Sequence, residues 1–120
     1  MTSQAEAIRS LNDRFRTNIP NVTDVPGRVM LTQGIRQLTD DEVEPGKLLP
    51  QLFKSVREFD DFSEDNDPHH EHDFGAFDFK GEKVFWKIDY YALDLLHGSE
   101  DPADPAKTMR VLTIMLASEY

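Results

Sequence analysis

Residues 74–91 read FGAFDFKGEKVFWKIDYY, and this stretch decides the fold. Aromatic and β-branched residues alternate with other residues in two runs, and in the second run Val84, Trp86 and Ile88 hold alternate positions. A period of two is typical of strands that bury one face. The runs are separated by residues 80–82, and a short connection that contains glycine is typical of a β-hairpin. We therefore predict an antiparallel hairpin at the centre of a small sheet.

The N-terminal residues predict a helix. Ser3 and Glu6 have the spacing of a capping box, in which each side chain satisfies a free backbone amide at the start of a helix. Ile8, Leu11 and Phe15 follow on one helical face. The helix is expected to continue to about residue 17.

The middle of the chain predicts one further strand and a second helical region. Residues 28–32 are short and apolar at the centre, which favours a strand that joins the hairpin. Thr39 and Glu42 repeat the capping-box spacing, so a helical region is expected to begin there. Its main helix is predicted over residues 47–59, with Pro50 accepted only within the first turn.

The closing segment is predicted to be a third helix. Asp104 and Pro105 suit the start of a helix, and Met109, Leu112 and Met115 then line one helical face. A strand over residues 110–116 is the competing interpretation, because β-branched residues are present. The helix is the interpretation we favour.

These elements predict an α+β fold in a single domain over residues 1–120. A small antiparallel sheet is built on the central hairpin, and about three helices pack on one of its faces. The helices and strands are expected to share one apolar core. The predicted core residues are Leu11, Phe15, Leu52, Val56, Leu112 and Met115.

Composition excludes several classes of protein. The chain has 120 residues, 13 Lys and Arg against 23 Asp and Glu, a formal net charge of −10 and no Cys. No apolar run approaches the roughly 18 residues of a membrane span, and the N-terminus lacks the pattern of a secretory signal. Without Cys there are no disulfides or thiolate metal sites, so a cytoplasmic location is expected. A charge of −10 repels a phosphate backbone, which argues against direct binding of nucleic acid.

Residues 58–78 are the most unusual stretch, because they hold nine carboxylates and three histidines but no Lys or Arg. So many carboxylates cannot all be neutralised locally and must face water, a cation or a basic partner. Binding of a basic protein surface is the interpretation we favour. The expected contact residues are Asp60, Asp61, Glu64, Asp65, Asp67, Glu71, Asp73 and Tyr91. No cofactor is then required.

A divalent-metal site is the alternative. Asp67, His69, His72 and Asp73 would supply a mixed nitrogen and oxygen ligand set, and a carboxylate would activate a bound water as in a metal-dependent hydrolase. The H-E-x-x-H and calcium-loop patterns are both absent. The spacing of Asp78 and Lys80 also matches an acid-x-Lys nuclease pattern, but a three-residue match is frequent by chance.

Several longer blocks of sequence resemble a family of small bacterial proteins that is catalogued only as a domain of unknown function. The blocks are residues 59–62, 65–69, 71–75, 85–91, 101–105 and 110–117. The resemblance runs from about Ile8 to Tyr120 and implies a setting on plasmids and other mobile elements. It implies no activity, cofactor or catalytic residue. The position of His70 is often a small residue in that family, which leaves His69 and His72 as the better pair.

Together these observations predict a non-enzymatic, acidic interaction protein. Its expected partner is a basic protein surface, and its specific form would be a mimic of nucleic acid that inhibits a nucleic-acid-binding defence complex. The carboxylates would occupy the Lys and Arg positions that normally hold phosphates. The divalent-metal-binding protein or metal-dependent hydrolase remains the alternative.

Overall fold

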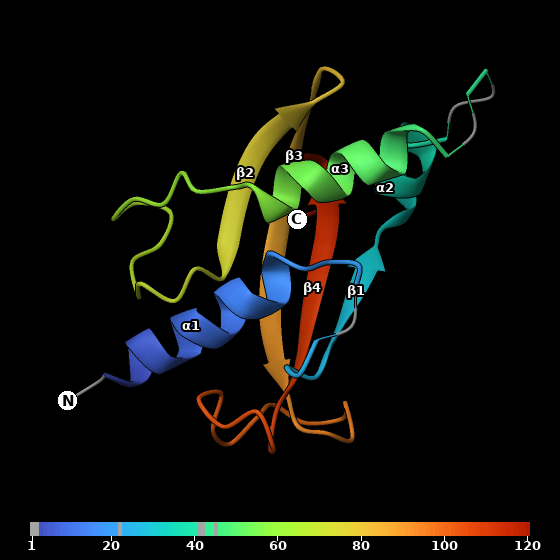
Figure 1. Cartoon of the computed structure of the whole chain (residues 1–120). Coiled ribbons are helices and arrows are strands. Elements are labelled where there is room, and N and C mark those ends of the chain that lie inside the picture. The colour runs from blue at the N-terminus through green and yellow to red at the C-terminus, as the bar shows by residue number, and fades with distance from the viewer. Residues whose placement is uncertain (1–2, 22, 41–42, 45) are drawn as a thin grey trace.

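The computed structural model of the chain describes residues 3–21, 23–40, 43–44 and 46–120 (Figure 1). Within these residues, three α-helices, four strands and a short 3₁₀-helix follow one another. Their order and bounds are α1 (Gln4–Arg16), β1 (Gly27–Leu31), α2 (Gln33–Leu38), α3 (Leu48–Arg57), β2 (Phe74–Phe79), β3 (Glu82–Tyr91), β4 (Met109–Leu116) and η1 (Ala117–Glu119). The predicted α+β class is confirmed.

The predicted hairpin is present as β2 and β3, but it does not lie at the centre of the sheet. The strand order is β1-β4-β3-β2, so β2 is an edge strand and the two inner strands are β3 and β4. The connecting residues Lys80 and Gly81 have φ angles of 53° and 80°, which is the geometry of a tight two-residue hairpin turn. β1 runs parallel to β4, with Val29 beside Leu112, so the sheet is mixed and not purely antiparallel.

The closing segment is a strand, and our prediction of a helix there is wrong. β4 pairs with β3 on one side and with β1 on the other, and Ile114 lies opposite Trp86. Leu112 and Ile114 are fully buried, whereas Met115 points to the opposite face of the sheet. The apolar residues of this segment are so nearly continuous that they fit both the period of a helix and the period of a strand. The two neighbouring strands decide in favour of the strand, because they pair with the backbone of β4 along both of its edges and replace the bonds that a helix would have made internally.

The capping residues explain where the first two helices begin. The Ser3 hydroxyl accepts the Glu6 backbone N–H at 3.1 Å, which confirms the start of α1. The Thr32 hydroxyl caps α2 in the same way, accepting the Ile35 N–H at 3.4 Å. Thr39 closes this helix at its C-terminal end, so the helix start that we predicted at Thr39 is wrong, and Glu42 lies outside the described residues.

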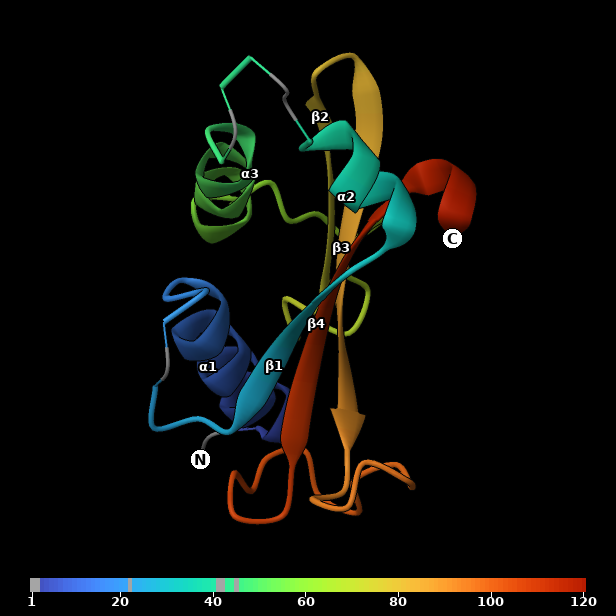
Figure 2. The same ribbon diagram turned by 90° about the vertical axis from the view of Figure 1, so that its right-hand side faces the viewer.

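α3 confirms the predicted second helix, shortened to Leu48–Arg57, with Pro50 in the first turn as expected. Figure 2 shows α1 and α3 on the same face of the sheet, with α2 beyond the end of β1. Side chains from all three helices reach one core, which they share with the inner strands. Its most buried members are Ile35, Leu52, Val56, Val84, Trp86, Leu112 and Ile114. None of the helices in the described part of the chain is both long and apolar enough to cross a bilayer.

A substitution at Gly75 of β2 tests how closely this edge strand packs against the rings of Trp86 and Phe59. A Cβ atom at position 75 would overlap the Trp86 indole nitrogen and lie 2.7 Å from Cε1 of Phe59. We expect Gly75→Ala to lower the free energy of unfolding by about 1–3 kcal/mol, because these rings have no free volume to move into. Gly98→Ala is the matched control, since its nearest neighbouring atom would be 4.0 Å away. Urea denaturation measures both; equal midpoints for the two variants would contradict the packing described here.

Candidate functional site

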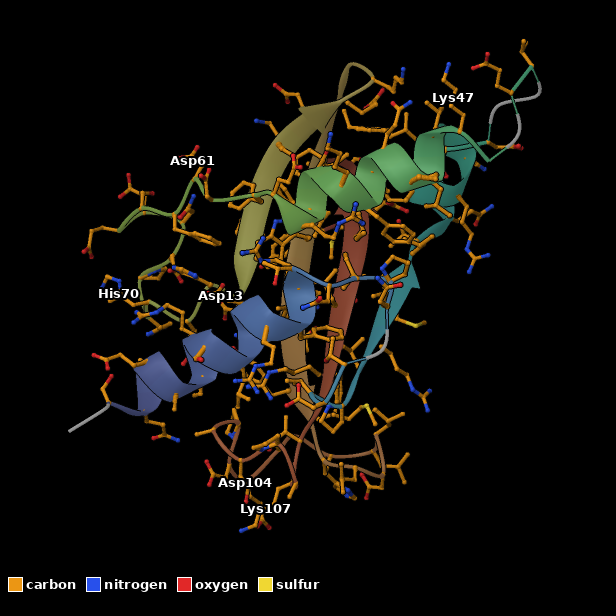
Figure 3. The ribbon with its side chains drawn as sticks, in the orientation of Figure 1. Asp13, Lys47, Asp61, His70, Asp104 and Lys107 are labelled. Atoms are coloured by element: carbon orange, nitrogen blue, oxygen red, sulfur yellow. The ribbon has the colours of Figure 1, made fainter. Side chains whose placement is uncertain are left out.

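The acidic loop, residues 58–73, connects α3 to β2 and projects beside α1. Five of its carboxylates are exposed: Glu58 at the end of α3, and Asp60, Asp61, Glu64 and Asp65, the four that belong to the predicted contact residues. Among the described residues, no Lys or Arg side chain forms an ion pair with any of these four carboxylates. Figure 3 shows Asp61 and His70 on the outer side of the loop, turned away from the sheet. Glu64 lies 3.6 Å from Nε2 of His70, so the only described ion-pair contact of these four carboxylates is with an exposed histidine. The described Lys and Arg side chains leave their negative charge unpaired.

Asp67, in contrast, is turned inward and is only 2% exposed. One of its carboxylate oxygens accepts the backbone N–H groups of Glu71 and His72, each at 3.1 Å. Its own backbone N–H donates to the Ser63 carbonyl at 2.8 Å, which closes the loop on itself. Asp67 therefore shapes the loop and is not available to a partner. Sequence alone does not distinguish it from its exposed neighbours.

His72 joins the loop to α1. Its imidazole stacks on the Phe62 ring with centroids 3.7 Å apart, and Nδ1 lies 2.9 Å from a carboxylate oxygen of Asp13. Nε2 lies 3.7 Å from the Asp67 carboxylate, so the ring sits between two acids. The backbone of His72 has a φ of 54°, an uncommon conformation for a residue with a side chain. These contacts on both sides of the ring hold that conformation in place.

Arg16 fixes the beginning of the loop from beneath. Its buried guanidinium donates to the carbonyls of Val56 at 2.7 Å and Phe59 at 3.0 Å, at the end of α3. The same group lies 5.0 Å from the Trp86 ring centroid, a cation–π distance. Burial lowers the pKa of Arg16, while the nearby Asp13 carboxylate acts in the opposite direction. The carbonyls take the place of water around this cation.

A second buried network fixes the other end of the loop. The Asn12 side-chain amide donates to the Glu71 carbonyl at 2.9 Å and to the Tyr90 hydroxyl at 2.8 Å. The Tyr90 hydroxyl in turn donates to the Glu71 carboxylate at 2.9 Å, and Arg110 Nε donates to the side-chain oxygen of Asn12 at 2.6 Å. Burial raises the pKa of Tyr90 and lowers that of Arg110. The network keeps Glu71 half-buried and holds β3, β4, α1 and the loop together.

The remaining predicted contact residues lie apart from the four exposed carboxylates. Asp73 is half-buried where β2 begins, and burial together with the charge of Glu71 raises its pKa. Tyr91 lies on the face of the sheet opposite the helices, in register with Met109. The predicted contact residues therefore do not form one surface. Four carboxylates are exposed, Asp67, Glu71 and Asp73 are buried or half-buried, and Tyr91 lies on another face of the sheet.

The four candidate metal ligands are only partly brought together. His72 lies near Asp67, but His69 is exposed. Within the described ranges, no group of three or more His, Cys, Asp or Glu side chains is placed where it could hold a metal ion. The acid-x-Lys pattern falls across the hairpin turn, where the Asp78 carboxylate is 3.6 Å from Lys83. The divalent-metal site stays a prediction without support from this geometry.

Sequence reasoning missed the three α1 residues that hold the loop: Asn12, Asp13 and Arg16. A signal for two of them exists, because Asn12 and Arg16 share a helical face with Ile8. Polar residues on an apolar face indicate buried polar contacts, but their partners lie more than 40 residues away in sequence and cannot be read from spacing.

A family model described as "Protein of unknown function (DUF3768)" matches residues 31–119. The chain belongs to the DUF3768 family. The DUF3768 match contains the whole acidic loop and all four carboxylates, together with Arg110 and Tyr90. It begins after α1, so the matched region does not include the helix that anchors the loop. No curated protein and no solved structure matches the chain.

Asp67→Ala should release the loop while leaving the sheet intact. Without the carboxylate, the N–H groups of Glu71 and His72 lose their acceptor, a loss of about 1–3 kcal/mol for each buried donor left unpaired. We expect hydrogen exchange at these two amides to become much faster, while exchange in β3 stays slow. Asp65→Ala, at an exposed neighbouring carboxylate, should leave both amides as they are. Unchanged exchange in Asp67→Ala would show that the loop is held by other contacts.

Asp73→Asn should stabilise the protein at neutral pH. An unfolded Asp titrates near pH 3.9, and the pKa of Asp73 in the folded chain is higher. The folded state therefore favours the protonated acid, and the wild type loses stability as the pH rises from about 4 through the folded pKa. We expect Asp73→Asn to melt at a higher temperature than the wild type at pH 7 and at nearly the same temperature at pH 3.

Asp65→Asn controls for the loss of one negative charge in the same loop. It removes an exposed carboxylate and is expected to show a smaller stability difference from the wild type across this range. Thermal unfolding followed by circular dichroism between pH 3 and pH 8 measures all three proteins. A stability difference for Asp73→Asn that does not change with pH would contradict the raised pKa.

Proposed function

We propose that the chain is a non-enzymatic interaction protein whose acidic loop binds a basic surface of a partner protein. The observation that carries the proposal is the set of exposed carboxylates at Asp60, Asp61, Glu64 and Asp65, which no described Lys or Arg side chain pairs. Unpaired exposed charge of one sign attracts the opposite sign and steers association.

The anchoring of the loop supports this proposal, because it lowers the cost of binding. A flexible acidic segment must be ordered when it binds, and that lost entropy reduces affinity. Here Arg16 holds the first carbonyls of the loop and Asn12 holds its last turn, while Asp67 bonds the backbone in between. The exposed carboxylates are therefore presented on a backbone that is already ordered.

The narrower form of the proposal is mimicry of a phosphate backbone. Carboxylates on an ordered loop can occupy Lys and Arg side chains that normally contact phosphates, and a net charge of −10 favours the approach to such a surface. The mobile-element setting implied by the family resemblance motivates a nucleic-acid-binding defence complex as the target and the cytoplasm as the place of action. The divalent-metal alternative has less support, since its four candidate residues do not converge.

Removing four exposed charges of the acidic loop should weaken binding to a basic probe. The variant combines Asp60→Asn, Asp61→Asn, Glu64→Gln and Asp65→Asn, and the probe is a fluorescently labelled peptide of nine arginines. We expect affinity at 50 mM salt to fall about tenfold or more, because each exposed ion pair contributes up to about 1 kcal/mol. The dependence of log K on log salt should also become less steep. Fluorescence anisotropy between 50 and 500 mM salt measures both quantities.

The matched control removes the same number of charges elsewhere. Asp40→Asn, Asp78→Asn, Glu82→Gln and Glu100→Gln are all at exposed positions outside the acidic loop. This variant should keep most of the wild-type affinity for the peptide. If the two variants lose affinity equally, the binding follows net charge alone and the loop is not the site. Binding that does not respond to salt would also overturn the proposal.

A further inference from the structure

The outer edge of β1 presents backbone groups that the sheet does not use. β1 is the last strand in the order β1-β4-β3-β2, as Figure 1 shows. The backbone N–H of Arg110 donates to the Pro26 carbonyl at 3.1 Å, and the backbone N–H of Thr32 donates to the Ile114 carbonyl at 3.2 Å. Because a parallel ladder uses every second residue, these bonds place the N–H and C=O groups of Gly27, Val29 and Leu31 on the free edge.

The described residues of the loop that precedes β1 do not bond to these edge groups. Within the described part of the chain, no backbone hydrogen bond joins residues 18–25 to Gly27, Val29 or Leu31. Unpaired edge groups are a template for another strand, which is why an accessible edge often binds an extended segment.

A hollow of about 550 Å³ lies along this edge and has apolar walls. Phe15 of α1, Ile19 of the following loop, Val29 of β1 and Phe53 of α3 all line it. Its volume is in the range of small binding sites. Side chains that point to the helix face from an added strand would enter this hollow, because Val29 points to that face as well.

The charge around the hollow is opposite to that of the rest of the chain. Its lining includes Arg28 and Arg36 and, among the described residues, no Asp or Glu, although the chain has 23 acids against 13 bases. The exposed Arg28 is on the opposite face of β1 from Val29. The Arg36 side chain is at the end of the free edge, with Nε 3.5 Å from the Leu31 carbonyl. If another chain paired with the free edge of β1, acidic side chains of that chain could lie beside both arginines.

We propose that the β1 edge binds an extended segment of a partner protein in which apolar and acidic residues alternate. The backbone of the segment pairs with Gly27, with Val29 and with the N–H of Leu31, whose carbonyl already accepts from Arg36 Nε. Its apolar side chains enter the hollow, and its acidic side chains face Arg28. Arg36 receives a carboxylate at the end of the segment. This site takes an acidic ligand and lies apart from the acidic loop, so it is independent of the function proposed above.

Binding of a defined peptide tests this site. The probe is a fluorescently labelled eight-residue peptide in which valine alternates with glutamate, and the control peptide alternates valine with lysine. We expect the glutamate peptide to bind the wild type at least tenfold more tightly than the lysine peptide. The variant Arg28→Glu with Arg36→Glu should reverse this preference. Lys80→Glu with Lys107→Glu, which makes the same change of charge at exposed positions elsewhere, should keep it.

Amide exchange measured by NMR shows whether the peptide adds as a strand. The glutamate peptide should slow exchange at Gly27, Val29 and Leu31, and change little at Arg28 and Met30, whose amides already face β4. Absence of binding at 1 mM peptide, or binding without this alternating protection, would overturn the proposal. So would a wild-type dimer in sedimentation that the Arg28 and Arg36 variant abolishes, because a second copy would then be the occupant of the edge.

Discussion

The acidic loop depends on one buried cation, the guanidinium of Arg16. Removing a cation from water is unfavourable, and this one is 3% exposed. The carbonyls of Val56 and Phe59 offset that cost, together with the faces of Phe62 and Trp86. Carbonyls at the end of a helix carry a partial negative charge, so α3 supplies the electrostatic partner that a carboxylate would otherwise provide. The same contacts that pair a terminal nitrogen of the cation set the point where the loop leaves the helix.

This arrangement explains why the acids of the loop face outward. Arg16 is occupied by carbonyls and by Asp13, and Arg110 is occupied by Asn12 and the Pro102 carbonyl. The two most buried basic side chains therefore take few of the 23 acids as partners. The charge that remains is distributed unevenly, since the acidic loop lies beside α1 and the two arginines of the hollow lie at the β1 edge. The chain thus presents surfaces of opposite sign at two separate places.

The spacing of apolar residues predicted the elements in which it fits only a helix or only a strand. It failed where the same residues fit both. The hairpin, α1 and α3 each have one clear apolar face, whereas residues 111–116 are almost continuously apolar and fit a helix or a strand. An inner strand often has this character, because both of its neighbours and both of its faces are within the protein. Composition identified the acidic loop, but it could not separate Asp67 from Asp65. That difference comes from the turn that brings the Glu71 and His72 amides onto one carboxylate.

The two oppositely charged surfaces raise the question of whether copies of the chain bind one another. The acidic loop carries Phe62 between acids, which resembles the alternating pattern that the β1 edge would take. Two observations oppose that pairing. Phe62 is stacked on His72 at 3.7 Å and is not free to enter another hollow. The loop also bends back on itself, with φ angles of 58° at His70 and 54° at His72, and does not present an extended backbone for a ladder. The contacts that order the acidic loop therefore also keep it out of the groove of a second copy.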